Sequence, residues 1–342
     1  MGSSRSKSDG PKERVSINTQ LVSLAKRILP AYRLGSHTVR LIQATETKAV
    51  WKVYGRDRAY VLKRLNYGKE KMLFAIQAQK YIQDHGGPVP HLTRTRQGDL
   101  YVESNGQVFI LFDWAEGRKP SFSNLTDLRR AVRLLARFHR ASRGFHPEIP
   151  CRESTKLGKW PQQYEKMKTH FRDWQAASSI PSLSAALKPY WNSLIRYAEQ
   201  AQNYLSRSGY DIMARTEPRT LCHQDYSEGN ALLNGNEGVV IDLDSVTYDF
   251  PARDLRKLIL KLMQEKGRWD GSLYAKVMTW YTEVNPLSSG QMRLVHIDLS
   301  FPHLFYETAK NPFRKMTSYS ASKLMTAIRI EKEKNAALSE LI

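Results

Sequence analysis

Residues 221–245 read LCHQDYSEGNALLNGNEGVVIDLDS, and this stretch decides the fold of the 342-residue chain. Asp225 and Asn230 lie five positions apart in a polar loop, and after a short hairpin Asp242 closes an apolar strand. This order suits phosphoryl transfer, because one carboxylate can accept the proton of an acceptor hydroxyl while the amide and the second carboxylate hold Mg²⁺. Hard oxygen ligands are those that Mg²⁺ prefers.

In this stretch the sequence resembles the aminoglycoside phosphotransferase and choline kinase superfamily, whose catalytic loop is His-x-Asp-x-x-x-x-Asn and whose metal-binding Asp follows an Ile. The resemblance implies that Asp225 is the catalytic base and that His223 braces the catalytic loop. It implies that Asn230 and Asp242 bind Mg²⁺, with Asp244 as a further candidate ligand. ATP and Mg²⁺ are therefore the expected cofactors.

The resemblance extends over most of the chain and implies an α+β, protein-kinase-like fold of two lobes, with Mg-ATP bound between them. The expected N-terminal lobe is small and β-rich and covers residues 19–116, and the expected C-terminal lobe is mostly helical and covers 117–342. A helical insertion at about 120–215 would wall the acceptor site, with Trp160, Tyr164, Trp174 and Tyr190 as aromatic candidates or as plain core residues. Residues 1–18 are rich in Ser, Lys, Arg and Gly and predict a disordered basic tail.

Periodicity gives the local elements independently of the resemblance. Two β-rich runs flank a Gly-Arg-Asp-Arg turn, and two more are joined by Ser-Asn-Gly, which predicts two hairpins. Apolar residues at helical spacing predict three helices in the first two thirds of the chain. The predicted strands lie at 49–54, 59–63, 100–103 and 107–112, and the predicted helices at 69–85, 125–141 and 183–206.

The N-terminal half supplies candidate nucleotide-binding residues. Lys63 closes the second strand of the first hairpin, where the resemblance implies a lysine that pairs with the nucleotide phosphates. The apolar strand at 107–112 runs on into Asp113, Trp114 and Ala115, whose backbone groups are expected to hold the adenine edge. Together with Gln79 on the following helix, these four residues make up the expected ATP site.

Two features depart from the superfamily pattern. An acidic partner for Lys63 is expected on the following helix, but the inward face there presents Gln79, which can hydrogen-bond a lysine without neutralising it. No glycine lies between Gly35 and Gly55, so the expected phosphate loop at about 44–48 lacks the residues that allow close backbone approach. Both departures favour weak or absent catalysis.

Composition narrows the class of protein. Lys and Arg number 53 against 33 Asp and Glu, a net charge of +20 that favours anionic partners. Two cysteines form no disulfide framework, which predicts folding in a reducing cytoplasm, and no apolar run approaches the roughly 20 residues of a membrane span.

No zinc finger or RNA-recognition motif supports specific nucleic-acid binding. A transition-metal site at Cys222, His223 and Asp225 would lack a second ligand cluster.

Within the superfamily the sequence resembles the spore coat family related to CotS, in residues 221–245, in the strand at 61–64, in length and in basic character. This implies a spore coat-associated, ATP-dependent phosphotransferase that acts on a hydroxyl group of a small molecule or coat component. It would fold in the mother-cell cytoplasm and then join other coat proteins in the spore coat. The alternative is a catalytically weak or inactive pseudokinase that serves as a structural coat protein.

Overall fold

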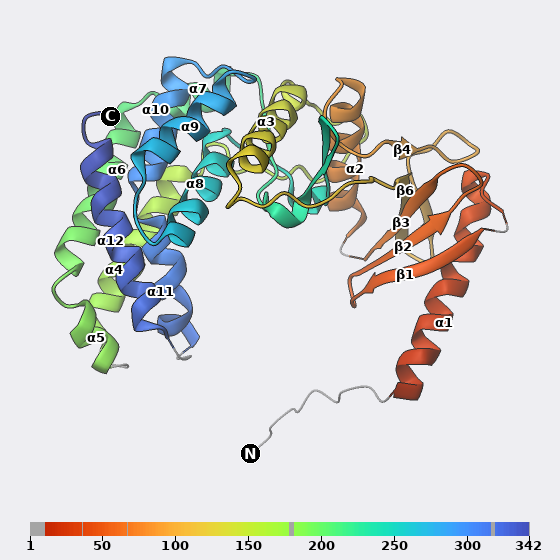
Figure 1. Cartoon of the computed structure of the whole chain (residues 1–342), viewed down its shortest axis with the longest axis horizontal. Helices are drawn as coiled ribbons and strands as arrows, with labels where there is room; N and C mark the ends of the chain where they lie inside the picture. Colours follow the sequence, from red (N-terminus) through yellow and green to blue (C-terminus); the bar gives the residue numbers. More distant parts are fainter. Residues whose placement is uncertain (1–10, 36, 67, 178–180, 316–318, 342) are drawn as a thin grey trace. The chain divides into compact units, whose positions relative to one another are not determined.

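The chain divides into two structural units in the computed structural model, which describes residues 11–35, 37–66, 68–177, 181–315 and 319–341 (Figure 1). The N-terminal unit comprises Met1–Asp84, Val89–Glu116 and Pro147–Glu153. The C-terminal unit comprises His85–Pro88, Gly117–His146 and Ser154–Ile342. Each unit is described by itself below. The fold is mixed α and β, as the sequence predicts, with the larger sheet near the N-terminus and mostly helices after it.

The N-terminal unit is built on a six-stranded antiparallel sheet in the order β1-β2-β3-β6-β4, with β5 paired to β6. Both predicted hairpins are confirmed, and the second turns through Asn105 and Gly106, which have φ values of 52° and 70°. The elements are α1 (Pro11–Ile28), η1 (Leu29–Tyr32), β1 (Thr38–Ala44), β2 (Lys48–Tyr54), β3 (Ala59–Leu65), α2 (Lys69–Asp84), β4 (Leu92–Thr93), β5 (Val102–Ser104) and β6 (Gln107–Asp113).

Helices α1 and α2 cover opposite faces of this sheet. Successive side chains of a strand point to opposite faces, and β6 accordingly gives Phe109 to the cluster that contains Ile28 of α1. Its next residue, Ile110, belongs to the cluster that contains Ile76 of α2. Lys63 of β3 is directly opposite Ile110 in the register, so it lies on the α2 face.

The N-terminal helix begins within the stretch that the sequence predicts to be a disordered tail. A disordered tail was expected up to residue 18, but α1 begins at Pro11, a residue type that suits the first helical position. The C-terminal end of α1 is held in the core by the buried Ala25 and Ile28. Once a helix has formed there, each further residue adds a backbone hydrogen bond at little cost in free energy. The prediction is therefore wrong for residues 11–18, and residues 1–10 lie outside the described part of the chain.

The C-terminal unit is mostly helical, with two small two-stranded sheets, β8-β9 and β10-β7. The short hairpin that the sequence predicts between Asn230 and Asp242 is confirmed as β8-β9. The helices of the C-terminal unit are α3 (Leu125–Ser142), α4 (Trp160–Ala176), α5 (Pro181–Leu187), α6 (Trp191–Arg207), α7 (Tyr210–Thr216), α8 (Ala252–Lys266), α9 (Gly271–Thr282), α10 (Ser289–Ser300), α11 (His303–Lys315) and α12 (Ala321–Leu338). Its other elements are β7 (Leu221–Cys222), η2 (Glu228–Asn230), β8 (Ala231–Asn234), β9 (Glu237–Val240), η3 (Leu243–Ser245) and β10 (Thr247–Tyr248).

The helix predicted at 183–206 is in fact two helices, α5 and α6. Pro189 lies in the break between them, and a proline disfavours helical geometry in the residue before it. The apolar periodicity continues across the break, which is why the pattern alone indicated one helix.

Most aromatic side chains of the helical region are core residues. Trp160, Tyr164 and Trp174 are buried, whereas Tyr190 is partly exposed. Tyr164 stacks on Phe301 at a ring distance of 4.4 Å, and the Trp160 indole donates to the Asp249 carboxylate at 2.9 Å. These three aromatic residues therefore stabilise the unit rather than wall an acceptor site. No helix in the described ranges has the length and apolar character needed to cross a membrane.

Candidate active site

The loop that carries Asp225 is fixed from beneath by a buried carboxylate. Asp254, in the first turn of α8, is 1% exposed and accepts hydrogen bonds from the backbone N–H of His223 at 2.6 Å and of Gln224 at 3.0 Å. Its Oδ2 also lies 3.1 Å from Nε2 of His139 on α3. The Asp254 carboxylate is thus turned toward the loop that carries Asp225.

Asp254 remains ionised in this site. Burial by itself would raise the pKa of its carboxyl, but the His139 hydrogen bond and the nearby charges of His139 and Lys257 lower that pKa to about 2. The other ring nitrogen of His139 lies 2.7 Å from the Tyr281 hydroxyl, so both sides of the imidazole are engaged. A fully hydrogen-bonded buried carboxylate of this kind holds a loop in one conformation.

His223 connects the catalytic loop to the segment that carries Asp242. Its Nδ1 accepts a hydrogen bond from the Asp225 N–H at 3.3 Å, and its Nε2 donates to the carbonyl of Ile241 at 3.0 Å. These two contacts together require the neutral tautomer with the proton on Nε2. His223 is fully buried, so it positions the loop and does not itself reach an acceptor.

Asp225 and Asn230 are in direct contact. The Asn230 side-chain amide donates to the Asp225 carbonyl at 2.8 Å and to its carboxylate at 3.3 Å. The Ile241 N–H donates to the Asn230 carbonyl at 3.0 Å, which ties the residue before Asp242 to the same loop. Asp225 is exposed, as a base that must meet an acceptor has to be. The C-terminal unit thus brings Asp225, Asn230 and the Asp242 segment together.

Asp242 follows β9 and precedes η3, and its backbone is left-handed with φ 64° and ψ 62°. A non-glycine residue in this region is strained by about 1 to 3 kcal/mol, and such strain concentrates at functional sites. Both Asp242 and Asp244, which lies within η3, are partly exposed. Both carboxylates are therefore accessible to solvent.

The donor set suits a divalent cation. Because the Asn230 amide nitrogen is directed to Asp225, its Oδ1 is left as an acceptor, and no residue in the described ranges donates to it. With the Asp242 carboxylate this provides the hard oxygen ligands that Mg²⁺ prefers. The residues present therefore fit the metal that the sequence predicts.

Two predicted nucleotide-binding residues lie on the α2 side of the N-terminal sheet. Lys63 is 5% exposed and Gln79 of α2 is 7% exposed. The Gln79 amide nitrogen donates to the carbonyl of Pro90 at 2.8 Å. Gln79 therefore serves as a link within the N-terminal unit, whichever role Lys63 has.

Fewer backbone N–H groups are available in the expected adenine-binding segment than the sequence suggests. The N–H of Asp113 donates to the His91 carbonyl at 2.9 Å, and that of Trp114 to the Ala59 carbonyl at 3.0 Å. In the described ranges the N–H of Ala115 makes no such hydrogen bond. Of the three backbone donors, Ala115 is therefore the one that remains for an adenine edge.

The turn between β1 and β2 closes on itself without a glycine. The Thr45 N–H donates to the Lys48 carbonyl at 2.7 Å, and the Lys48 N–H donates to the Thr45 hydroxyl at 3.0 Å. These contacts give the turn a defined local structure of its own. Two backbone N–H groups of this turn, those of Thr45 and Lys48, are therefore already hydrogen-bonded within it.

The cysteine near the catalytic loop belongs to the core. Cys222 groups with His139 and Asp254, all buried and with their potential ligand atoms within 4.8 Å of one another. The Cys222 thiol donates to the Phe250 carbonyl at 3.0 Å, and burial raises its pKa well above the usual range. In this structure the thiol and the carboxylate of the cluster are engaged in hydrogen bonds with the backbone.

Sequence reasoning missed His139 and Lys257. His139 stands on the apolar face of α3 between Leu135 and Ser142, and a polar residue in such a stripe is a signal for a buried partner. Lys257 donates to the Gln224 carbonyl, and burial lowers the pKa of its ammonium group. It comes one helical turn after Asp254, a spacing that places both on the same side of α8.

The chain is similar to known proteins over most of its length. Residues 38–282 match the phosphotransferase enzyme family. The chain is 26% identical over 328 residues to spore coat protein S of Bacillus subtilis (strain 168), a match that covers 93% of each chain.

Two solved structures show the same fold. An aminoglycoside phosphotransferase from Alicyclobacillus acidocaldarius superposes with a TM-score of 0.71 at 20% identity, over 92% of this chain and 94% of that one. An amicoumacin kinase, solved with AMP-PNP and Ca²⁺, superposes with a TM-score of 0.58 at 14% identity, over 97% of this chain and 100% of that one. Each is a likeness of fold.

Proposed function

This chain belongs to the phosphotransferase enzyme family, and from that premise we propose that it transfers the γ-phosphoryl group of ATP to a hydroxyl group of its acceptor. The observation that carries the proposal is the set of hydrogen bonds joining Asp225, Asn230 and Ile241, the neighbour of Asp242. This set gives the exposed carboxylate and the metal-ligand oxygens one shared scaffold. Amicoumacin kinase, with the same fold, was solved with a nucleotide and a divalent cation.

Asp225 orients the acceptor hydroxyl and accepts its proton, while the hydroxyl oxygen bonds to the γ-phosphorus and the bond to the β,γ-bridging oxygen breaks, releasing ADP. Mg²⁺, when bound, neutralises charge on the phosphate oxygens. Asn230 and Asp242 hold it, and Asp244 is the further candidate ligand. His223 keeps Asp225 in place through the two contacts of its ring.

In the N-terminal unit Lys63 steadies the phosphates, and Ala115, with the carbonyls of Asp113 and Trp114, holds the adenine edge. Gln79 supports the segment at Pro90. The buried position of Lys63 supports this role, because a lysine at the surface of a strand would lie in solvent.

The setting that we propose is the spore coat, reached from the mother-cell cytoplasm, with other coat proteins as partners. The likeness to spore coat protein S over 93% of both chains supports it. A fluorescent fusion followed through sporulation in an endospore-forming host tests it. We expect the signal to move from the mother-cell cytoplasm to the spore surface, and a signal that stays diffuse would contradict the proposal.

The test of phosphoryl transfer compares Asp242→Asn, Asp225→Asn and the control Asp173→Asn, an exposed residue of α4. Saturating Mg-ATP at about 100 times its Kd stabilises a protein by about 2.7 kcal/mol, a rise in Tm of about 5 °C here. Asp242→Asn should lose the Mg²⁺-dependent part of that rise. Asp225→Asn should keep it and lose ADP release with polyhydroxylated acceptors by about 10²-fold or more.

The control should match the parent in both assays. If Asp242→Asn and Asp225→Asn both melt like the parent in saturating Mg-ATP and release ADP at the parent rate, the site is assigned wrongly. Omitting Mg²⁺ from the parent provides the reference for the nucleotide alone.

A second candidate function is that of a structural coat protein with a pseudokinase fold. The glycine-free β1-β2 turn and the commitment of Gln79 to Pro90 favour it. It predicts no change in Tm with Mg-ATP at any concentration. The same thermal-shift measurement on the parent therefore separates the two functions.

A further inference from the structure

A row of arginines lines one face of α3 in the C-terminal unit. Arg130, Arg133, Arg137 and Arg140 are spaced by three, four and three residues, which places them on one side of a helix. A rise of 1.5 Å per residue makes the row about 15 Å long. We call these four residues the arginine row.

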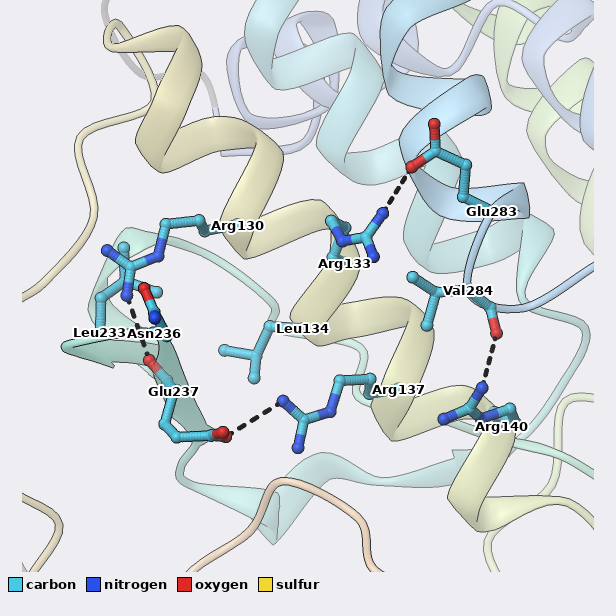
Figure 2. Close-up of a pocket in the computed structure, with 11 residues that line it drawn as sticks. Arg130, Arg133, Leu134, Arg137, Arg140, Leu233, Asn236, Glu237, Glu283 and Val284 are labelled. Atoms are coloured by element: carbon cyan, nitrogen blue, oxygen red, sulfur yellow. Dashed lines mark hydrogen bonds and ion pairs between the residues drawn. The ribbon is translucent and has the colours of Figure 1, made fainter.

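The arginine row borders a cavity of about 380 Å³ (Figure 2). One wall is the β8-β9 hairpin, through Leu233, Asn236, Glu237 and Gly238, and the other is the end of α9 with Glu283 and Val284. Leu134 lies between the arginines and gives the cavity an apolar floor. Four arginines against two glutamates leave the lining with an excess of positive charge.

The arginines alternate between the two walls (Figure 2). Arg130 donates to the Gly235 and Glu237 carbonyls, and Arg137 to the Glu237 carboxylate at 3.3 Å. On the other wall Arg133 donates to the Glu283 carboxylate. Arg140 donates to the Val284 carbonyl at 3.1 Å.

Each of these contacts uses one nitrogen of a guanidinium group, which has several N–H donors. Arg133, Arg137, Glu237 and Glu283 have side chains that are 40%, 36%, 76% and 42% exposed. Ion pairs this exposed contribute little, so carboxylates from another molecule can replace them at small cost. The two glutamates thus show which kind of group the arginines already bind.

From this geometry we propose that the arginine row is a docking site for an acidic segment of a partner protein. An extended segment rises about 3.3 Å per residue, so about five residues span the row. Its alternate side chains point to one side, about 7 Å apart, which is close to the separation of about 5 to 6 Å between helix residues three or four apart. A segment of about five residues with a carboxylate at every second residue therefore brings three carboxylates to the four guanidinium groups of the row.

Charge and shape favour this occupant over a single phosphate group. One phosphate can meet two guanidinium groups, whereas the row presents four of them along about 15 Å. The proposal does not depend on phosphoryl transfer, because the site can be tested without nucleotide.

The test measures binding of a fluorescein-labelled peptide of alternating Glu and Ser to the full chain by fluorescence anisotropy, at fixed salt concentration. Arg133→Gln and Arg137→Gln should each weaken binding by about threefold to tenfold. The matched control is Arg172→Gln on α4, an arginine that is 52% exposed and paired with Glu199 at 3.0 Å. It should leave affinity within about twofold of the parent.

Glu283→Gln gives an opposite prediction. It removes the carboxylate that competes for Arg133, so peptide binding should strengthen by about threefold. Urea unfolding of the variant, compared with the parent, shows that the gain belongs to the folded protein.

Three results would overturn the proposal. Equal weakening by all three arginine variants would show binding to the overall positive charge. Parent-like affinity of Arg133→Gln and Arg137→Gln would place the peptide elsewhere. Binding of tripolyphosphate that depends on these two arginines, with no binding of the peptide, would make the cavity a phosphate site.

Discussion

The catalytic loop at 223–230 and the β1-β2 turn at 45–48 are both short connections, but they are held in different ways. The catalytic loop is fixed by Asp254, which lies about thirty residues further along the chain and is buried. The β1-β2 turn is closed by Thr45, three residues from its partner Lys48. A loop held from the core is as rigid as the core, whereas the contacts of the β1-β2 turn lie at the surface, both those within it and those from Arg64 and Asn66 at the end of β3.

This difference indicates where the protein is pre-organised. The groups proposed for proton transfer and metal binding have a buried foundation, and the turn expected over the phosphates has none among the contacts described. Substitutions in the residues that hold each connection should therefore have unequal effects, largest for the catalytic loop and smallest for the β1-β2 turn.

Asp254→Asn should destabilise the protein by about 3 kcal/mol, because it removes a buried charge that three donors share. Urea unfolding measures this loss, and ADP release should fall with it as the loop loosens. The matched control is Asp270→Asn, at the N-cap of α9, where Asn caps as well as Asp does. Equal losses for the two variants would show that Asp254 has no special role.

The stability of the parent should fall by about 2 kcal/mol through Asp254 as the pH drops from about 4 to about 2. The pKa of this carboxyl is lower in the folded state than its ordinary 3.8, so its contribution is complete above that value and is lost towards about 2. The difference in unfolding free energy between the parent and Asp254→Asn, measured across this range, isolates the effect. A difference that does not shrink at low pH would contradict it.

His223→Ala should cost about 2 kcal/mol in stability, through two lost hydrogen bonds and a small cavity. Because the ring also holds the carbonyl before Asp242, the Mg²⁺-dependent rise in Tm with ATP should shrink. A variant with the expected loss of stability but the full Mg²⁺-dependent rise would separate His223 from the metal-ligand segment.

Thr45→Ala should cost only about 0.5 kcal/mol, since it removes two exposed hydrogen bonds between the Thr45 hydroxyl and the backbone of Lys48. The rise in Tm with Mg-ATP should stay within about 1 °C of the parent value. A large loss of that rise would show that the turn is a phosphate-binding element after all, and the contrast between the two connections would fail.

Much of the local structure could be read from the sequence. The first hairpin follows from β-rich runs around a polar turn, and α3 from apolar residues at helical spacing. The prediction of one helix at 183–206 failed because of a single residue, Pro189, which lies between the two helices that form there. Residues 11–18 were misjudged because their own composition is polar, whereas the helix that includes them is anchored further along at Ile28.

The grouping of Asp225 with Asn230 is likewise a local matter, because five residues of one loop join them and their contact lies within it. The roles of Asp254 and His139 are not local. Asp254 is thirty-one residues from His223 and His139 is 115 residues from Asp254, so only packing brings them together. The sequence therefore showed the loop but not what holds it.

The sequence by itself determined the order of polar groups in residues 221–245, the hairpins and most helices, since hydrogen-bond and side-chain patterns over a few residues set these. Only the packing of the elements showed that Asp254 binds the catalytic loop, that Cys222 is a buried thiol bonded to the Phe250 carbonyl and that four arginines of α3 border one cavity. The physical reason is that burial and the choice of a distant partner depend on how all the elements pack together, whereas periodicity reports only which side of its own element a residue occupies.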